Sequence, residues 1–244
     1  PVRDCVTGNA AYWIREFHLE GLRLDATKAL FDDRPRHIIT EIGLAARAAA
    51  GDRSILLFAE NEDQRIQHVV PVEQGGYGLD GLWNDDFHHA CRVAATGHAE
   101  FYYGDYRGSP QELVSAVLRG YLYQGQWNLR QQRFRGTATR NVDRPHFVHF
   151  LQNHDQVANS ALGLRLHDLS TPGRFRALTA LLLLTPETPL LFMGQEFAAS
   201  SPFFYFADHE VDVAKMVREG RLEFLRRFER VATFPPEELA DPAD

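Results

Sequence analysis

The sequence predicts an α/β protein built on a parallel sheet. Apolar runs of strand length alternate along the chain with stretches whose apolar residues recur at helical spacing. Of the 244 residues, 44% are hydrophobic, which is enough for a substantial core. Three of the strand-like runs end on an acidic residue, and the carboxyl ends of such strands are where an α/β fold places its catalytic groups.

The strands are predicted from apolar runs that polar or turn residues interrupt. In chain order they cover residues 22–25, 54–59, 77–83, 146–152 and 190–193. Helices are expected between them. Asn9 is a candidate N-cap for a first helix that ends at Gly21, and a second helix follows Pro35 and closes at Gly51.

The later helices follow the same rules. Ser109 and Thr171 each precede a proline, which typically opens a helix, and residues 212–231 show a further helical pattern. Residues 124–145 are polar and aperiodic, so we expect a long loop there. The acidic, Pro-rich end is expected to be mobile, which predicts one domain over 1–234 and a mobile tail over 235–244.

Composition excludes several classes of function. The net charge of −7 and the pI near 5.9 argue against a nucleic-acid or anionic-membrane partner. No apolar run reaches 18 residues, so no membrane-spanning segment is predicted. Cys5 and Cys91 lack metal-site spacing and indicate a reduced, cytoplasmic protein. No signal peptide is visible, and because Pro1 replaces the usual Met, we expect residues upstream of it. The sequence carries no signal from which the oligomeric state could be predicted.

The pair Arg23 and Asp25 is the most informative motif. Side chains alternate along a strand, so these two stand side by side at the end of strand 22–25. The arginine favours the ionised form of the carboxyl group, as a nucleophile requires. Taken alone, an R-x-D pair also fits a structural ion pair.

Two further strands end on acids. Strand 54–59 stops at Glu60, and strand 146–152 stops at Asn153, His154 and Asp155. Singly, Glu60 and Asp155 also fit helix N-caps or surface acids. Together with Arg23 and in this order, the three acids favour a catalytic set.

These strand ends resemble the conserved regions of the α-amylase superfamily of glycoside hydrolases, which carry a G-[FL]-R-x-D strand, a strand ending in Glu, and an N-H-D strand end. The sequence is more similar still to one family within it, the maltooligosyltrehalose trehalohydrolases, from about residue 7 to about residue 230. The matching segments are GNAAYWIREFHLEGLRLDATKAL, LLFAENE, GYGLDGLWNDDFHHA, FYYGDYRG, FLQNHDQVAN and LLFMGQEFAASSPFFYFADH.

The resemblance implies a (β/α)8 TIM-type barrel, present here as about its last five β/α units. The first three strands of the family's barrel and its terminal β-domains have no counterpart. Five strands leave two open sheet edges. We therefore expect the chain to be a fragment of a longer reading frame, and an inactive sugar-binding fragment is one reading of it.

The resemblance also implies site residues. Asp25 would be the nucleophile, Glu60 the acid/base, and Asp155 the third catalytic carboxylate. Glu60 follows an apolar strand, so burial and nearby acids are expected to raise its pKa. The implied substrate-binding residues are Arg23, Lys28, Trp83, Asp85, Asp86, Phe87, His88, His89, His154, Gln156 and Asn159. The family often has His where this sequence has Lys28.

The segment Trp83–His89 mixes aromatic and polar side chains, which suits a saccharide cleft. The rival reading is a metal cluster, but adjacent histidines point apart and no third ligand has metal spacing. No metal or cofactor is predicted. The expected reaction is retaining hydrolysis of the α-1,4-glucosidic bond next to the terminal trehalose of maltooligosyltrehalose. The alternative is a glucan branching enzyme, which transfers chains.

Overall fold

The structure is a computed structural model that describes residues 1–242. Its internal contacts divide the chain into two compact units. Unit 1 comprises residues 1–86, 115–149 and 186–188, and unit 2 comprises the rest of the described chain. The sequence predicts one domain over residues 1–234 and carries no signal for this division.

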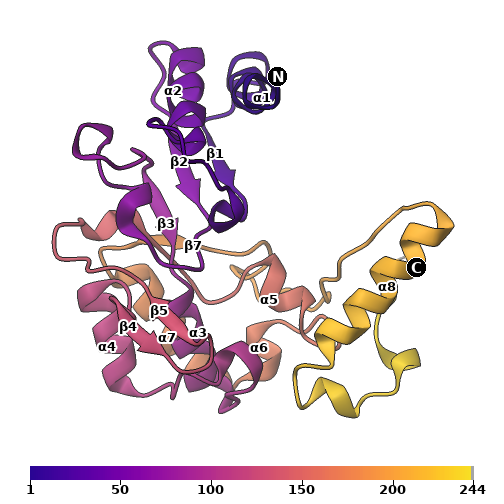
Figure 1. The fold of residues 1–244 in the computed structure, drawn as a ribbon. Coiled ribbons are helices and arrows are strands. Elements are labelled where there is room, and N and C mark those ends of the chain that lie inside the picture. The colour runs from indigo at the N-terminus through magenta and orange to yellow at the C-terminus, as the bar shows by residue number, and fades with distance from the viewer. Residues whose placement is uncertain (243–244) are drawn as a thin grey trace. The chain divides into compact units, whose positions relative to one another are not determined.

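A parallel sheet organises unit 1 (Figure 1). Within the described residues its strands are β1 (Gly21–Leu24), β2 (Leu56–Ala59), β3 (Gly81–Trp83), β6 (Phe147–Phe150) and β7 (Thr188–Leu190), in the order β1-β2-β3-β6-β7. The last residue of β6 and the last two of β7 count with unit 2. The pairs β1–β2, β2–β3 and β3–β6 are parallel, as the sequence predicts.

The register of β1 and β2 fixes the position of two acids. Leu24 lies opposite Ala59, and Asp25 and Glu60 are the next residues of the two strands. Parallel strands end at the same edge of a sheet. The two carboxylates therefore leave the sheet at one edge, from neighbouring strands.

Helices alternate with these strands. They are α1 (Val2–Glu16), α2 (Ile38–Ala50), α3 (Asp85–Thr96), α4 (Pro110–Arg119), α5 (His154–Ala158), α6 (Leu166–Leu169), α7 (Pro172–Leu184) and α8 (Val211–Leu225). Two predicted helix ends are confirmed. Gly51 closes α2 at a φ of 62°, which a side chain would strain. The Thr171 side chain accepts a hydrogen bond from the backbone N–H of Arg174 and caps α7.

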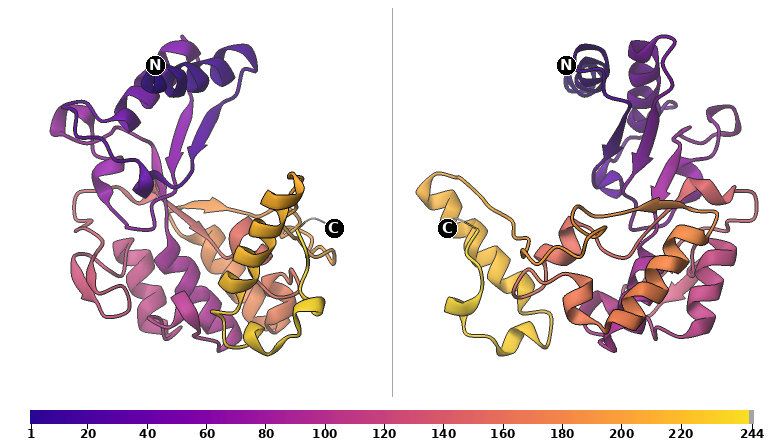
Figure 2. Two further views of the ribbon diagram at one scale, coloured as in Figure 1. Left: turned by 45° about the vertical axis from the view of Figure 1, so that its right-hand side comes forward. Right: turned by 180° about the vertical axis from the view of Figure 1, so that it is seen from behind.

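The core of unit 1 lies between the helices α1 and α2 and the sheet. The two helices lie side by side (Figures 1 and 2) and contribute Ile14 and Ile39. Leu57, Leu82 and Phe147 from the strands are fully buried beside them. Each such side chain contributes about 1.5–3 kcal/mol when it leaves water, so this packing fixes the ends of β1 and β2.

Several predicted boundaries differ from the structure. Helix α1 begins at Val2 instead of Asn9, and the predicted strand 77–83 is reduced to β3. The predicted loop 124–145 contains an antiparallel hairpin of β4 (Gln126–Asn128) and β5 (Arg133–Arg135). Its strands are short and polar, so they lack the alternation from which strands are predicted.

The acidic end of the chain packs against the rest of unit 2. Pro236–Glu238 form a turn of 3₁₀ helix, and the Leu239 side chain is buried. Arg218 of α8 pairs with Asp241 at 3.0 Å, and Figure 2 shows this segment in yellow beside α8. The mobility of 235–244 stays a prediction, and residues 243–244 lie outside the described chain.

Candidate active site

One guanidinium group holds the two carboxylates at the end of β1 and β2. Arg23 Nη1 lies 2.6 Å from Asp25 Oδ1, and Arg23 Nη2 lies 2.7 Å from Glu60 Oε2. Such short, charge-assisted contacts fix geometry as well as charge. The predicted Arg23–Asp25 pair is present, and Glu60 joins it.

The backbone also positions Glu60. Its N–H donates to the carbonyl oxygen of Leu24 at 2.9 Å, which extends the β1–β2 pairing by one residue. The N–H of Ala26 donates to Glu60 Oε2 at 3.0 Å. Glu60 begins no helix, which removes the N-cap reading for this residue.

The two carboxyl groups differ in their surroundings. The side chain of Asp25 is 72% exposed, whereas that of Glu60 is 24% exposed. Burial, followed by the proximity of Asp25, raises the pKa of Glu60. A carboxyl group that keeps its proton can act as a general acid, and a more exposed neighbour can attack.

Trp83 supports the arginine from the other side. The Arg23 guanidinium lies over the indole ring, 4.2 Å from its centroid, which is a favourable cation–π geometry. The indole is almost completely buried at the end of β3. Arg23 Nε is buried and has no hydrogen-bond partner among the described residues.

Asp86 is fully buried and serves the fold of unit 1. Its Oδ2 accepts hydrogen bonds from the backbone N–H groups of Leu122 and Tyr123 at 2.6 and 3.0 Å, and Arg135 Nη2 lies 3.3 Å from Oδ1. Asp85 is also buried, and burial raises its pKa to about 7. The expectation that these two acids bind sugar directly does not match their burial.

The rest of the WNDDFHH motif is buried as well. In unit 2, His88 Nδ1 lies 2.9 Å from the carbonyl oxygen of Leu151, and its ring stacks on Phe150. Burial lowers the pKa of His88 to about 3, so this ring is neutral at ordinary pH. His89 lies in a cluster of tyrosine rings, and Phe87 has no exposed surface. Like Asp86, the side chains of Phe87 and His88 have no exposed surface that a sugar could contact in this structure.

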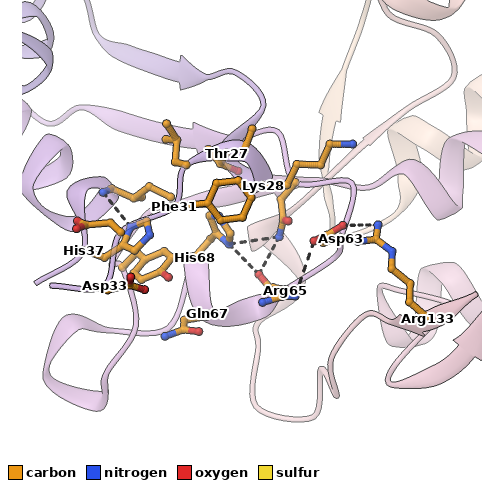
Figure 3. A pocket seen from close by; sticks show the side chains of 16 residues that line it. Thr27, Lys28, Phe31, Asp33, His37, Asp63, Arg65, Gln67, His68 and Arg133 are labelled. Atoms are coloured by element: carbon orange, nitrogen blue, oxygen red, sulfur yellow. Dashed lines mark hydrogen bonds and ion pairs between the residues drawn. The ribbon is translucent and has the colours of Figure 1, made fainter. Parts of the chain in front are cut away.

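A pocket in unit 1 is lined by residues that follow the two carboxylates in the chain (Figure 3). Its cavity volume is about 610 Å³, within the range of small-molecule sites. Thr27 and Lys28 line it from the segment after Asp25, and Asn61 lines it from the residue after Glu60. Lys28 forms an ion pair with Glu62, so its positive charge is partly compensated.

The walls of this pocket combine rings with polar groups. His37 stacks on Tyr77 with ring centroids 4.4 Å apart, and Phe31 exposes 91% of its surface. His68 is buried in the wall, its pKa is lowered to about 4 by burial, and its Nε2 has no partner among the described residues. Asp63 pairs with Arg133 at 2.7 Å on another side. This mixture can face both the C–H surfaces and the hydroxyl groups of a sugar.

Asp155 lies in unit 2, in the first turn of α5. The cap of that helix is Asn153, whose Oδ1 accepts hydrogen bonds from the N–H groups of Asp155 and Gln156. The carboxyl group of Asp155 is therefore not the cap, and its side chain is 34% exposed. His154 Nε2 lies 3.7 Å from Asp155 Oδ1.

Two other predicted sugar contacts lie nearby in unit 2. Gln156 is buried with its Oε1 unpartnered in the described chain, and Asn159 Oδ1 accepts a hydrogen bond from Arg221. Both line a small cavity of about 80 Å³, which is too small for a sugar ring. Sequence reasoning missed Arg221, and it included Tyr205 only within the matching segment LLFMGQEFAASSPFFYFADH.

Metal and membrane features are absent from the described part of the chain. No three His, Cys, Asp or Glu side chains within residues 1–242 gather closely enough to hold a metal ion. Likewise, none of the helices in that range is both long and apolar enough to span a bilayer.

Comparison with known proteins gives extensive matches. The malto-oligosyltrehalose trehalohydrolase of Deinococcus radiodurans is 42% identical over 99% of this chain and 39% of its own length. That of Saccharolobus solfataricus is 36% identical over 90% of the chain and 38% of its length. The chain thus spans about two fifths of the length of these relatives. No protein-family profile matches it.

Solved structures agree with these matches. A Salmonella typhimurium structure with a provisional α-amylase assignment is 37% identical over 100% of this chain and 41% of that one, with a TM-score of 0.89. A debranching enzyme of Nostoc punctiforme has a TM-score of 0.55 over 96% of this chain at 17% identity, which shows the fold alone. A glucan branching enzyme of Francisella philomiragia matches at 32% identity over only 34% of the chain.

Proposed function

We propose that this chain supplies catalytic residues for the release of trehalose from maltooligosyltrehalose. The chain belongs to the maltooligosyltrehalose trehalohydrolases of the α-amylase superfamily. The reaction is retaining hydrolysis of the α-1,4-glucosidic bond next to the terminal trehalose. The observation that carries the proposal is the contact of Arg23 with both Asp25 and Glu60 at the ends of neighbouring strands.

The two carboxyl groups take different roles in this reaction. Asp25, the more exposed acid, attacks the anomeric carbon and forms a covalent glycosyl-enzyme intermediate. Glu60, with its raised pKa, protonates the oxygen of the leaving sugar and then activates the water that releases the second product. Asp155 is the third carboxylate of the proposed set and binds sugar hydroxyls.

The pocket lined by residues that follow the two carboxylates in the chain supports the same assignment. The general acid faces the leaving group, and Asn61 follows Glu60 directly into the pocket wall. We assign the pocket to the released sugar, with Phe31, His37 and Tyr77 offering ring surfaces. Asp86, Phe87 and His88 are assigned to the support of the site, because they are fully buried.

Product analysis on the full-length protein tests this function. The protein is incubated with maltooligosyltrehalose and with a maltooligosaccharide of equal length, and released trehalose is measured by chromatography. Preferential cleavage of maltooligosyltrehalose with trehalose as product is expected. Equal cleavage of both substrates would contradict the specificity. The Asp25→Asn variant serves as the inactive control.

A glucan branching enzyme is the second candidate, since one such enzyme matches a third of the chain. It would transfer chains to new branch points instead of releasing trehalose. A shift in the iodine stain of treated amylose without trehalose release would favour it.

We also propose a cytoplasmic location, because Cys5 and Cys91 are free thiols, which a reducing compartment preserves.

A further inference from the structure

Asp155 receives a hydrogen bond from an aromatic side chain far along the chain. The phenol of Tyr205 donates to Asp155 Oδ1, the same oxygen that lies 3.7 Å from His154 Nε2. One carboxylate oxygen is thus held by the protein, in a side chain that is 34% exposed.

The segment that carries Tyr205 is itself fixed. Ser201 accepts a hydrogen bond from Arg165 Nε at 2.9 Å through its carbonyl oxygen, and the N–H of Phe203 donates to the carbonyl oxygen of Gly163 at 3.1 Å. Phe203 and Tyr205 turn inward, whereas Phe206 is 88% exposed. The extended backbone therefore presents the phenol toward Asp155 from an anchored position.

Arg221 of α8 contacts both the Tyr205 ring and the end of α5. Its guanidinium lies 5.1 Å from the centroid of the Tyr205 ring. Its Nη2 donates to the carbonyl oxygen of Ala158 at 2.6 Å, and its Nη1 donates to Asn159 Oδ1. A single cation thus ties the end of α5, which carries Asp155, to the ring that holds the Asp155 carboxylate.

We propose that Tyr205 and Arg221 are positioning residues that set the orientation of the Asp155 carboxylate toward substrate. This inference rests on the proposed function, in which Asp155 binds sugar hydroxyls. A carboxylate that can rotate loses part of its transition-state contact, so the tyrosine raises kcat without itself touching the sugar.

The first test is kinetic and uses the full-length protein. Tyr205→Phe keeps the ring and removes only the donor. We expect kcat to fall about tenfold while KM changes less than about threefold, since a hydrogen bond to a charged group is lost. Arg221→Met should lower kcat in the same sense. Matched controls are Tyr12→Phe on α1 and Arg218→Met, one turn from Arg221 on α8, which should both retain wild-type kcat.

The second test does not depend on turnover. The Asp155 carboxyl carbon is followed by NMR in protein labelled with ¹³C-aspartate, and its signal is assigned by its loss in Asp155→Asn. Its chemical shift should move in Tyr205→Phe and stay unchanged in Tyr12→Phe, because only the first variant removes a hydrogen-bond donor from this carboxylate. His154, Tyr102 and Arg221, which also neighbour Asp155 in unit 2, stay in place in that variant.

The outcomes distinguish a failure of the positioning role from a failure of the proposed function. A double variant, Asp155→Asn with Tyr205→Phe, should be no slower than Asp155→Asn alone, because the tyrosine acts through the aspartate. Unchanged kcat and an unchanged Asp155 chemical shift in Tyr205→Phe would overturn the positioning role. A wild-type protein that releases no trehalose would instead contradict the proposed function, and the NMR signal of Asp155 would still decide on the positioning.

Discussion

The guanidinium of Arg23 lies 4.2 Å from the centroid of the Trp83 ring, with the carboxylates of Asp25 and Glu60 at its two terminal nitrogens. The Trp83 ring thus packs against the flat face of the Arg23 guanidinium, and the two proposed catalytic acids contact the nitrogens at its edge. Because the indole is buried, it is a rigid support. Trp83, which is predicted to contact sugar, thus contacts the arginine that holds both acids.

Replacing Trp83 by Leu should therefore weaken catalysis through Arg23. A cation–π contact of this kind contributes about 0.5–2 kcal/mol, which corresponds to a loss of activity of up to about thirtyfold. The positive charge of Arg23 lowers the pKa of Glu60, so loosening it raises that pKa further. The alkaline limb of the pH profile of kcat/KM should then move to higher pH.

Trp13→Leu on α1 is the matched control for this variant, since Trp13 is 40% exposed and its ring contacts Tyr12 and Phe17. An unmoved alkaline limb in Trp83→Leu, together with wild-type activity, would show that the indole does not act on the site.

Asp25→Asn should abolish turnover while leaving the fold intact, because the amide keeps the shape of the carboxylate and removes the nucleophile. Initial rates and the thermal unfolding curve check both parts of the statement. Residual activity above a few per cent of the wild type, free of contaminating enzyme, would refute the role.

Glu60→Gln should be inactive on the natural substrate but partly active on a glycosyl fluoride. Fluoride leaves without a proton, so general acid help is dispensable in the first step. Fluoride release in a burst, followed by slow turnover, is the expected progress curve. Equal losses on both substrates would argue against Glu60 as the acid.

The strand ends were predictable because local patterns determine them. The apolar runs before Asp25 and Glu60 predict two strands. Parallel pairing then brings the carboxyl ends of these strands to the same edge of the sheet. The Arg23–Asp25 contact follows from the alternation of side chains along one strand. Each of these inferences needs only neighbouring residues.

The contacts of Asp86, His88 and Tyr205 were not predictable from local patterns. Asp86 and His88 look like ligand-binding groups in the sequence, but distant backbone groups satisfy them: Leu122 and Tyr123 for Asp86, and Leu151 for His88. The Tyr205–Asp155 contact joins residues 50 positions apart. Whether a polar side chain faces solvent or core is decided by tertiary contacts, which one sequence does not display.

Asp85 should make the stability of the protein fall as the pH rises. Burial raises its folded-state pKa to about 7 from an ordinary value of 3.8, so the folded protein holds this proton more tightly than the unfolded chain does. The stability it contributes is present below about pH 4 and is lost as the pH rises through 7. The upper limit is about 4 kcal/mol, since one pKa unit corresponds to about 1.4 kcal/mol.

Urea unfolding midpoints of the wild type and Asp85→Asn at pH 4 and pH 7 test this dependence. Other groups, such as His68, titrate in both proteins and cancel in the difference. The gap between the two midpoints should change in favour of Asp85→Asn as the pH rises. A constant gap would mean that Asp85 titrates normally.

Phe31 is expected to contribute a stacking surface for the leaving sugar. Its ring is 91% exposed although it lines the pocket formed by residues that follow Asp25 and Glu60, and an aromatic face can stack on the C–H surface of a sugar. Phe31→Ala should raise KM for maltooligosyltrehalose about threefold to tenfold, for a loss of about 0.5–1.5 kcal/mol, with little change in kcat. Inhibition by added trehalose should weaken by a similar factor, because the released sugar occupies the same pocket. Phe17→Ala, at a phenylalanine that is 53% exposed on the C-cap of α1, should alter neither constant. If KM rises while trehalose inhibition is unchanged, the ring contacts another part of the substrate and the pocket does not hold the leaving sugar.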